Sequence, residues 1–128
     1  MIFGIGTDIV SQARISSLWQ KYGDRLAERI LHPAEMPAYQ QSTQKTHLLS
    51  KRFAAKEAFS KACGTGLRPP LSLRAIGVGH DEQGKPRFIL EPVVQEWLDQ
   101  RGIGAIHLSI TDEREFACAF VVLEMKGN

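Results

Sequence analysis

The segment from residue 52 to residue 61, Arg-Phe-Ala-Ala-Lys-Glu-Ala-Phe-Ser-Lys, contains the residues best suited to chemistry in this sequence. A helix turns by about 100° per residue, so Glu57 and Lys61 lie one turn apart on the same side. On an exposed helix such a pair adds only about 0.2–0.5 kcal/mol of stability and needs no function. Alanines beside the pair leave room for close approach, and a Gly-Thr-Gly turn follows at residues 64–66. Because these groups would also suit a metal-bound phosphate, both interpretations stay open.

Two further polar side chains lie on predicted strands. Asp8 follows Gly6-Thr7 at the end of an apolar strand, where a single aspartate commonly caps the next helix. In the strand Ala105–Thr111, apolar and polar residues alternate, which puts His107 on the polar face. A polar strand face is usually solvated, and it equally suits the lining of a cleft in which a histidine donates to a phosphate.

Four basic residues form a stripe along the first predicted helix, Ser11–Ile30. Counted around the helix from Arg14, the other three fall within about 60° of it: Lys21, Arg25 and Arg29. The acidic residues Asp24 and Glu28 lie off the stripe and do not neutralise it. A solvated basic face is the common outcome, but the stripe also suits an acidic protein partner or a nucleic-acid backbone.

The helices and strands that carry these residues belong to one domain of ordinary composition, which we expect to span residues 1–128. Hydrophobic residues make up 43% of the chain, charged residues 23%, and the net charge is +2, which excludes a disordered chain and gives no sign of a nucleic-acid binder. The longest apolar run, Phe116–Leu123, is far too short to span a membrane, and Asp8 interrupts any secretion signal. The two cysteines stand apart, which favours free thiols in the cytoplasm.

The order of periodic segments predicts an α+β fold, in which helices pack on one face of a largely antiparallel sheet. The later strands follow one another too closely for parallel crossovers. The elements we expect are the strands Met1–Val10, Leu71–Gly79, Arg87–Leu90, Ala105–Thr111 and Glu115–Glu124, and the helices Ser11–Ile30, a short one from Pro33, Leu48–Cys63 and Pro92–Arg101.

Several motifs together resemble one known family. They are Gly4-Ile5-Gly6-Thr7-Asp8, the RFAAKEA segment with Lys61, Gly64-Thr65-Gly66, Gly84-Lys85-Pro86 and Ile106-His107-Leu108-Ser109. In this order they resemble the holo-[acyl-carrier-protein] synthases, the small bacterial type of 4′-phosphopantetheinyl transferase, over essentially the whole chain. One departure is Ser11-Gln12, where the family commonly has an acidic residue and then an apolar one.

The resemblance implies a 4′-phosphopantetheinyl transferase-like fold and a reaction. Such enzymes move the phosphopantetheine arm of coenzyme A to a serine of apo-acyl carrier protein and release adenosine 3′,5′-bisphosphate, in the service of fatty acid biosynthesis. By position, Asp8 and Glu57 would ligate Mg²⁺ and Lys61 would contact the pyrophosphate, with Glu57, through a metal-bound water, as the candidate base. Arg52, Gly64 and His107 would be further coenzyme A contacts.

The resemblance also implies partners. Acyl carrier proteins are acidic, so the basic stripe would attract them. We predict that the carrier protein docks at Arg14, Lys21 and Arg25. The family is usually a homotrimer with active sites between subunits. We expect no nucleic acid and no membrane as partners.

Other functions are weaker on the residues. Another Mg²⁺-dependent, nucleotide-binding phosphoryl-transfer protein would be expected to carry a GxxxxGK[ST] loop or a dinucleotide fingerprint, and the sequence has neither. A module that binds nucleic acid through the first helix would need a stacking aromatic platform, and the sequence shows none. An inactive homologue is disfavoured by the joint presence of Asp8, Glu57 and Lys61.

Overall fold

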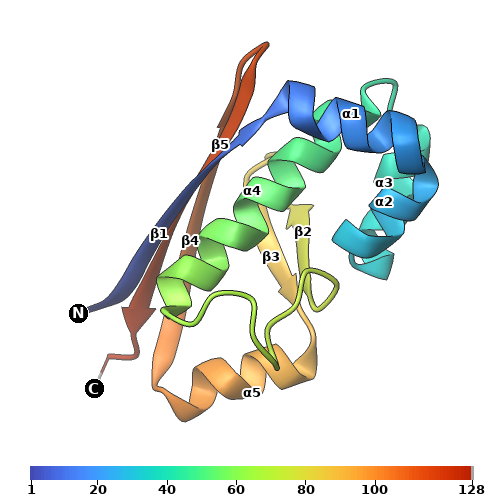
Figure 1. Ribbon diagram of the computed structural model, residues 1–128. Coiled ribbons are helices and arrows are strands. Elements are labelled where there is room, and N and C mark those ends of the chain that lie inside the picture. Colours follow the sequence, from blue (N-terminus) through green and yellow to red (C-terminus); the bar gives the residue numbers. More distant parts are fainter. Residues whose placement is uncertain (128) are drawn as a thin grey trace.

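A long helix crosses a curved three-stranded sheet in the computed structural model, which describes residues 1–127 (Figure 1). In chain order the elements are β1 (Ile2–Ser11), α1 (Gln12–Tyr22), α2 (Asp24–Ile30), a 3₁₀ turn (Pro33–Glu35), α3 (Met36–Gln41), α4 (Lys45–Cys63), β2 (Ile76–His80), β3 (Pro86–Leu90), α5 (Pro92–Gln100), β4 (Ile103–Asp112) and β5 (Phe116–Met125). This is the α+β arrangement predicted from the sequence.

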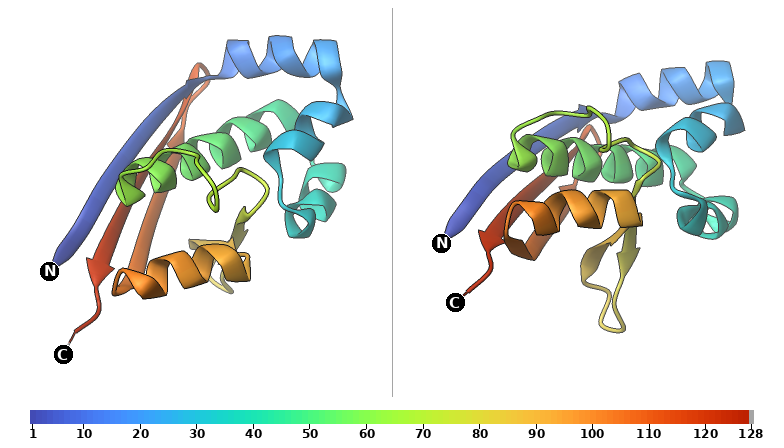
Figure 2. Two further views of the ribbon diagram at one scale, coloured as in Figure 1. Left: turned by 60° about the horizontal axis from the view of Figure 1, so that its bottom comes forward. Right: turned by 90° about the horizontal axis from the view of Figure 1, so that it is seen from below.

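The sheet has the order β1-β5-β4, and both pairs of neighbours are antiparallel. The strands β2 and β3 form a separate antiparallel hairpin. The helices lie on one side of the three-stranded sheet, and α4 packs directly against it (Figure 2). Residues that alternate along β1, β5 and β4 therefore point either toward α4 or toward the opposite, outer face of the sheet.

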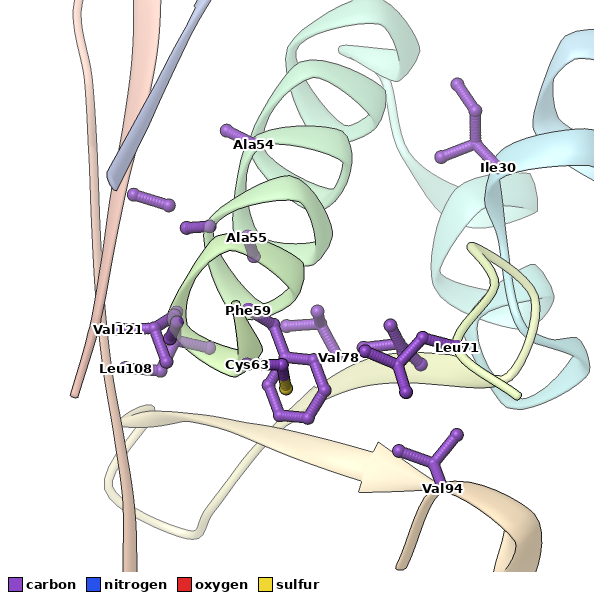
Figure 3. Close-up of a cluster of buried hydrophobic side chains, with 14 of the residues drawn as sticks. Ile30, Ala54, Ala55, Phe59, Cys63, Leu71, Val78, Val94, Leu108 and Val121 are labelled. Carbon is purple, nitrogen blue, oxygen red and sulfur yellow. The ribbon is translucent and has the colours of Figure 1, made fainter. Parts of the chain in front are cut away.

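The core lies between α4 and the strands it crosses. Ala54, Ala55 and Phe59 of α4 are fully buried, and Val121 of β5 is buried on the side of the sheet that faces this helix (Figure 3). Small alanine side chains let the helix approach the sheet closely, while Phe59 extends to the β2–β3 hairpin, where its ring centroid lies 4.9 Å from that of Phe88. The helix α4 is therefore enclosed on most sides, and the strands of the sheet and the helices α1, α2 and α3 all pack against it.

The structure corrects two predicted elements. The helix expected over Ser11–Ile30 is two helices, because Gly23 adopts a positive φ of 58° and its amide donates to the Trp19 carbonyl, which ends α1. The strand expected over Leu71–Gly79 begins only at Ile76, since hydrogen bonds between backbone groups three residues apart fold residues 68–75 into turns. No helix within residues 1–127 has the length and apolarity to cross a bilayer.

Candidate active site

Two glycines of β1 let this strand lie against the backbone of α4. A Cβ atom at Gly4 would stand 2.1 Å from the Ala62 carbonyl oxygen, and one at Gly6 would stand 2.0 Å from that of Ala58. Both distances are far below any permitted contact, so only glycine fits. Asp8 follows Gly6 by two residues on the same face of β1 and therefore points toward α4.

The side chains of Asp8 and Lys61 meet at this contact. The Lys61 Nζ donates to the Asp8 Oδ1 at 3.0 Å and to the Thr7 carbonyl at 3.1 Å. The Asp8 side chain is only 16% exposed, whereas that of Lys61 is 52% exposed. A largely shielded carboxylate thus lies beside a cation whose long side chain still reaches solvent.

Glu57 lies one turn before Lys61 on α4 and completes the cluster. Its pKa is raised, first by partial burial and then by repulsion from the Asp8 carboxylate, while the Lys61 ammonium acts in the opposite direction. The structure therefore brings Asp8, Glu57 and Lys61 together, although Asp8 is far from the other two in sequence.

The donor set of this cluster fits a hard divalent cation. Two carboxylates that repel each other are relieved by a cation between them, and Mg²⁺ prefers oxygen ligands. The described residues hold no group of three or more His, Cys, Asp or Glu side chains able to bind a metal. Two protein carboxylates suit Mg²⁺, which usually takes its other ligands from water and substrate phosphates.

A groove of about 820 Å³ opens beside Asp8 and Glu57. Its walls come largely from apolar side chains of α1 and α2, together with Phe53 and Leu73. Of the basic stripe, Arg14, Arg25 and Arg29 line the groove. Lys21 is not among the lining residues, and its Nζ lies 5.2 Å from the centre of the Tyr22 ring. The stripe was derived for a continuous helix, whereas the structure places Arg14 and Lys21 on α1 and the other two basic residues on α2.

Arg52 lies apart from this cluster, in a buried ionic network. Its guanidinium Nη1 donates to the Glu35 Oε2 at 3.0 Å and also to the Val78 carbonyl. Arg52 also contributes to the lining of a second, polar groove of about 560 Å³, together with Lys51, His80 and Gly84. Gly64 ends α4 with a φ of 85°, a conformation that favours glycine.

His107 lies on the outer face of the sheet, opposite to the side where Asp8 points. It pairs with Val122 across the β4–β5 ladder, and its Nε2 lies 2.5 Å from the Glu124 Oε1. The alternation predicted for this strand is confirmed, since Leu108 is buried while His107 and Ser109 are exposed. One chain alone does not bring His107 to Asp8 and Glu57.

Two buried ionisable residues near the site were not predicted from the sequence. Lys56 and Glu35 form an ion pair with no exposed side-chain surface on either residue. Lys56 lies inside the RFAAKEA segment, but a lysine gives no periodic signal of burial. Glu35 belongs to the 3₁₀ turn that begins at Pro33, and a single glutamate in so short a turn gives no sequence signal of burial.

Comparison with known proteins relates this geometry to a family. The model of the 4′-phosphopantetheinyl transferase superfamily matches residues 4–121. A holo-[acyl-carrier-protein] synthase of Nitrosospira multiformis is 53% identical over 124 residues, which are 97% of this chain and 99% of the relative. The chain belongs to the holo-[acyl-carrier-protein] synthase family. It is an enzyme of the transferase class, as the motifs predicted.

Solved structures of holo-[acyl-carrier-protein] synthases share the fold. The crystal structure from Neisseria meningitidis is 51% identical, has a TM-score of 0.94, and covers 97% of this chain and 99% of its own. A second, from Bacillus anthracis in complex with CoA (3′,5′-ADP), is 38% identical, has a TM-score of 0.81, and covers 98% of this chain and 99% of its own. The α+β fold class is thus confirmed on independent structures.

Proposed function

We propose that this protein transfers the 4′-phosphopantetheine arm of coenzyme A to a serine of apo-acyl carrier protein, with Mg²⁺, and releases adenosine 3′,5′-bisphosphate. The observation that carries the proposal is the cluster of Asp8, Glu57 and Lys61 beside the groove. We infer that the reaction takes place in the cytoplasm, serves fatty acid biosynthesis, and uses a single domain that spans residues 1–128.

Asp8 and Glu57 would hold the Mg²⁺, which supplies polarisation of the phosphorus centre and offsets charge on the departing bisphosphate. The Lys61 ammonium, on a half-exposed side chain, can turn from Asp8 toward the pyrophosphate and hold it. The serine oxygen forms a bond to phosphorus while the bond to the bisphosphate oxygen breaks. Glu57, acting through a metal-bound water, would take the serine proton.

Carrier-protein docking is assigned to the basic residues Arg14, Lys21 and Arg25. Arg14 and Arg25 stand on the wall of the groove that leads to Glu57. An acidic partner attracted to them would present its serine at the groove, while coenzyme A would reach the cluster through contacts with Arg52, Gly64 and His107.

The active assembly is proposed to be a homotrimer with active sites between subunits. The outer face of the sheet exposes large apolar side chains, with Ile5 58% and Phe120 44% exposed, and His107 shares this face. Apolar surface of this kind favours burial against another subunit. A neighbour packed there would bring its own cluster toward His107, which one chain alone does not do.

The test is the intact mass of apo-acyl carrier protein after incubation with this protein, coenzyme A and Mg²⁺. We expect a gain of one phosphopantetheine group, absent when EDTA is added and absent with Asp8→Ala. A Glu96→Gln protein, changed at an exposed carboxylate of α5, serves as the matched control and should remain active. Lack of a gain with several carrier proteins would overturn the proposal, and coenzyme A binding by calorimetry would then test the alternative of another nucleotide-binding phosphoryl-transfer protein.

A further inference from the structure

Lys56 is a buried lysine that the proposed mechanism does not use. Its side chain has no exposed surface, and its Nζ donates to the Ile30 carbonyl at 2.6 Å, to the Glu35 Oε1 at 2.5 Å and to the Leu73 carbonyl at 3.1 Å. An ammonium has three N–H donors, so every one of them is used. Its partners come from three separate segments of the chain.

Two of these partners belong to the walls of the groove beside Glu57. Ile30 is the last residue of α2, and Leu73 lies in the loop between α4 and β2. Both residues line the groove, as does Glu57, the residue after Lys56 on α4. The carbonyl of Ile30 has no partner within its own helix, because it belongs to the last turn. One ammonium therefore ties two walls of the groove to the helix that carries Glu57.

The charge of Lys56 is costly for a purely structural contact. Taking an ammonium out of water into a site with no exposed surface costs free energy even when the ammonium is paired. Buried ion pairs are often replaced by apolar side chains of similar volume without loss of stability. An apolar side chain would fill the same space, but it would leave the carbonyls of Ile30 and Leu73 without a donor.

We propose that Lys56 is a positioning residue, whose ammonium fixes the end of α2 and the loop at Leu73 relative to Glu57 and so sets the groove for the carrier protein. This inference rests on the proposed function for the identity of the groove's occupant. It assigns Lys56 no contact with either substrate.

Lys56→Met separates this role from folding. Methionine has a similar length, and Glu35 keeps its other partners, the Arg52 Nη1 at 3.0 Å and the His32 amide at 2.9 Å. The remaining ion pair is thus still compensated, and we expect the variant to fold. The matched control is Val94→Ala, a buried change on α5 that does not line the groove.

The experiment measures KM for each substrate with the two variants, compared at an equal margin below their Tm. For Lys56→Met we expect KM for apo-acyl carrier protein to rise about tenfold while KM for coenzyme A changes less than about twofold. Val94→Ala should change neither constant. An unchanged KM for the carrier protein, or an equal rise in both constants, overturns the proposal.

Hydrogen exchange gives a second readout that does not depend on transfer activity. Exchange at the Leu31 and Ala75 amides, which close the turns next to Ile30 and Leu73, should accelerate in Lys56→Met relative to Val94→Ala. Unchanged exchange at both amides would show that the Lys56 ammonium does not hold these two segments, and would overturn the proposal. If exchange accelerates in Lys56→Met as expected but the wild-type protein has no transfer activity, the proposed function is refuted while the positioning role of Lys56 stands.

Discussion

The charge of Glu57 is unfavourable in the folded chain without a bound cation. Its pKa is raised above 4.5 by burial and by Asp8, so the folded chain holds that proton to higher pH than the unfolded chain does. For this group, stability is therefore greatest below about pH 4.5 and falls as the pH rises through the folded pKa. Function at neutral pH thus comes at some expense of stability.

Glu57→Gln should abolish transfer and raise the Tm at pH 7. The reason is that the amide cannot take a proton from serine and is not repelled by Asp8. The gain in Tm should shrink toward pH 4, where Glu57 is protonated in both states, and thermal melts across this range measure it. Full activity at every pH would eliminate Glu57 as the base, and a lower Tm at pH 7 would show that its charge is not unfavourable in the folded chain.

Gln12 illustrates a different cost at a single residue. It is 6% exposed, and its side-chain amide has no hydrogen-bond partner within the described chain.

Gln12→Met should stabilise the protein by about 1 kcal/mol or more, because an unpaired buried amide is replaced by an apolar side chain of similar size. Chemical denaturation measures this change, and carrier-protein KM should stay constant. A loss of stability would show that the amide of Gln12 is satisfied in solution.

At the scale of elements, the contact between β1 and α4 determines how far Asp8 lies from Glu57. Gly6→Ala should lower stability by about 1–3 kcal/mol and reduce transfer strongly, because a Cβ facing the Ala58 carbonyl must push Asp8 away from Glu57. Gly127→Ala, at a position with open space, is the control and should change nothing. A fully active Gly6→Ala protein would show that the spacing of β1 and α4 does not control the carboxylates.

The helices α1 and α2 should contribute the attraction for the carrier protein. Reversing the charge of Arg14 and Arg25 should raise KM for the carrier protein and leave that for coenzyme A nearly unchanged, and added salt should act in the same direction. Lys126→Glu, on a half-exposed lysine outside the groove, is the control. Equal effects of salt on both substrates would refute this division of labour.

The elements also show what a sequence can predict. The sequence identified α4 and the β4–β5 hairpin to within a few residues, because buried and less buried positions alternate along β5 and Gly64 marks the end of α4. The break at Gly23 was missed because the apolar spacing continues through it. The motifs gave the candidate cluster, but the burial of Arg52 and Lys56 depends on Glu35, a long-range pairing that local patterns do not carry.

At the scale of the whole molecule, the two sides of the sheet hold different parts of the proposed site. We expect Asp8→Ala and His107→Ala proteins each to be impaired alone, and partial activity to return when both chains are co-expressed. The reason is that a mixed assembly would contain one interface with both residues intact. Transfer assays on the co-purified assembly measure this. A fully active His107→Ala protein, or no recovery in the mixture, would refute a shared site.

The strand order has a consequence for the synthesis of the protein. β1 is the first element of the chain, and the strand that pairs with it, β5, is the last. While a ribosome is still producing the chain, β1 has no strand to pair with, and its glycines make it a poor template on its own. A nascent chain stalled within β4 would carry Asp8 and Glu57 as separate groups on an unfinished sheet. We therefore expect the proposed cation binding and transfer to appear only after β5 has been synthesised and has paired with β1.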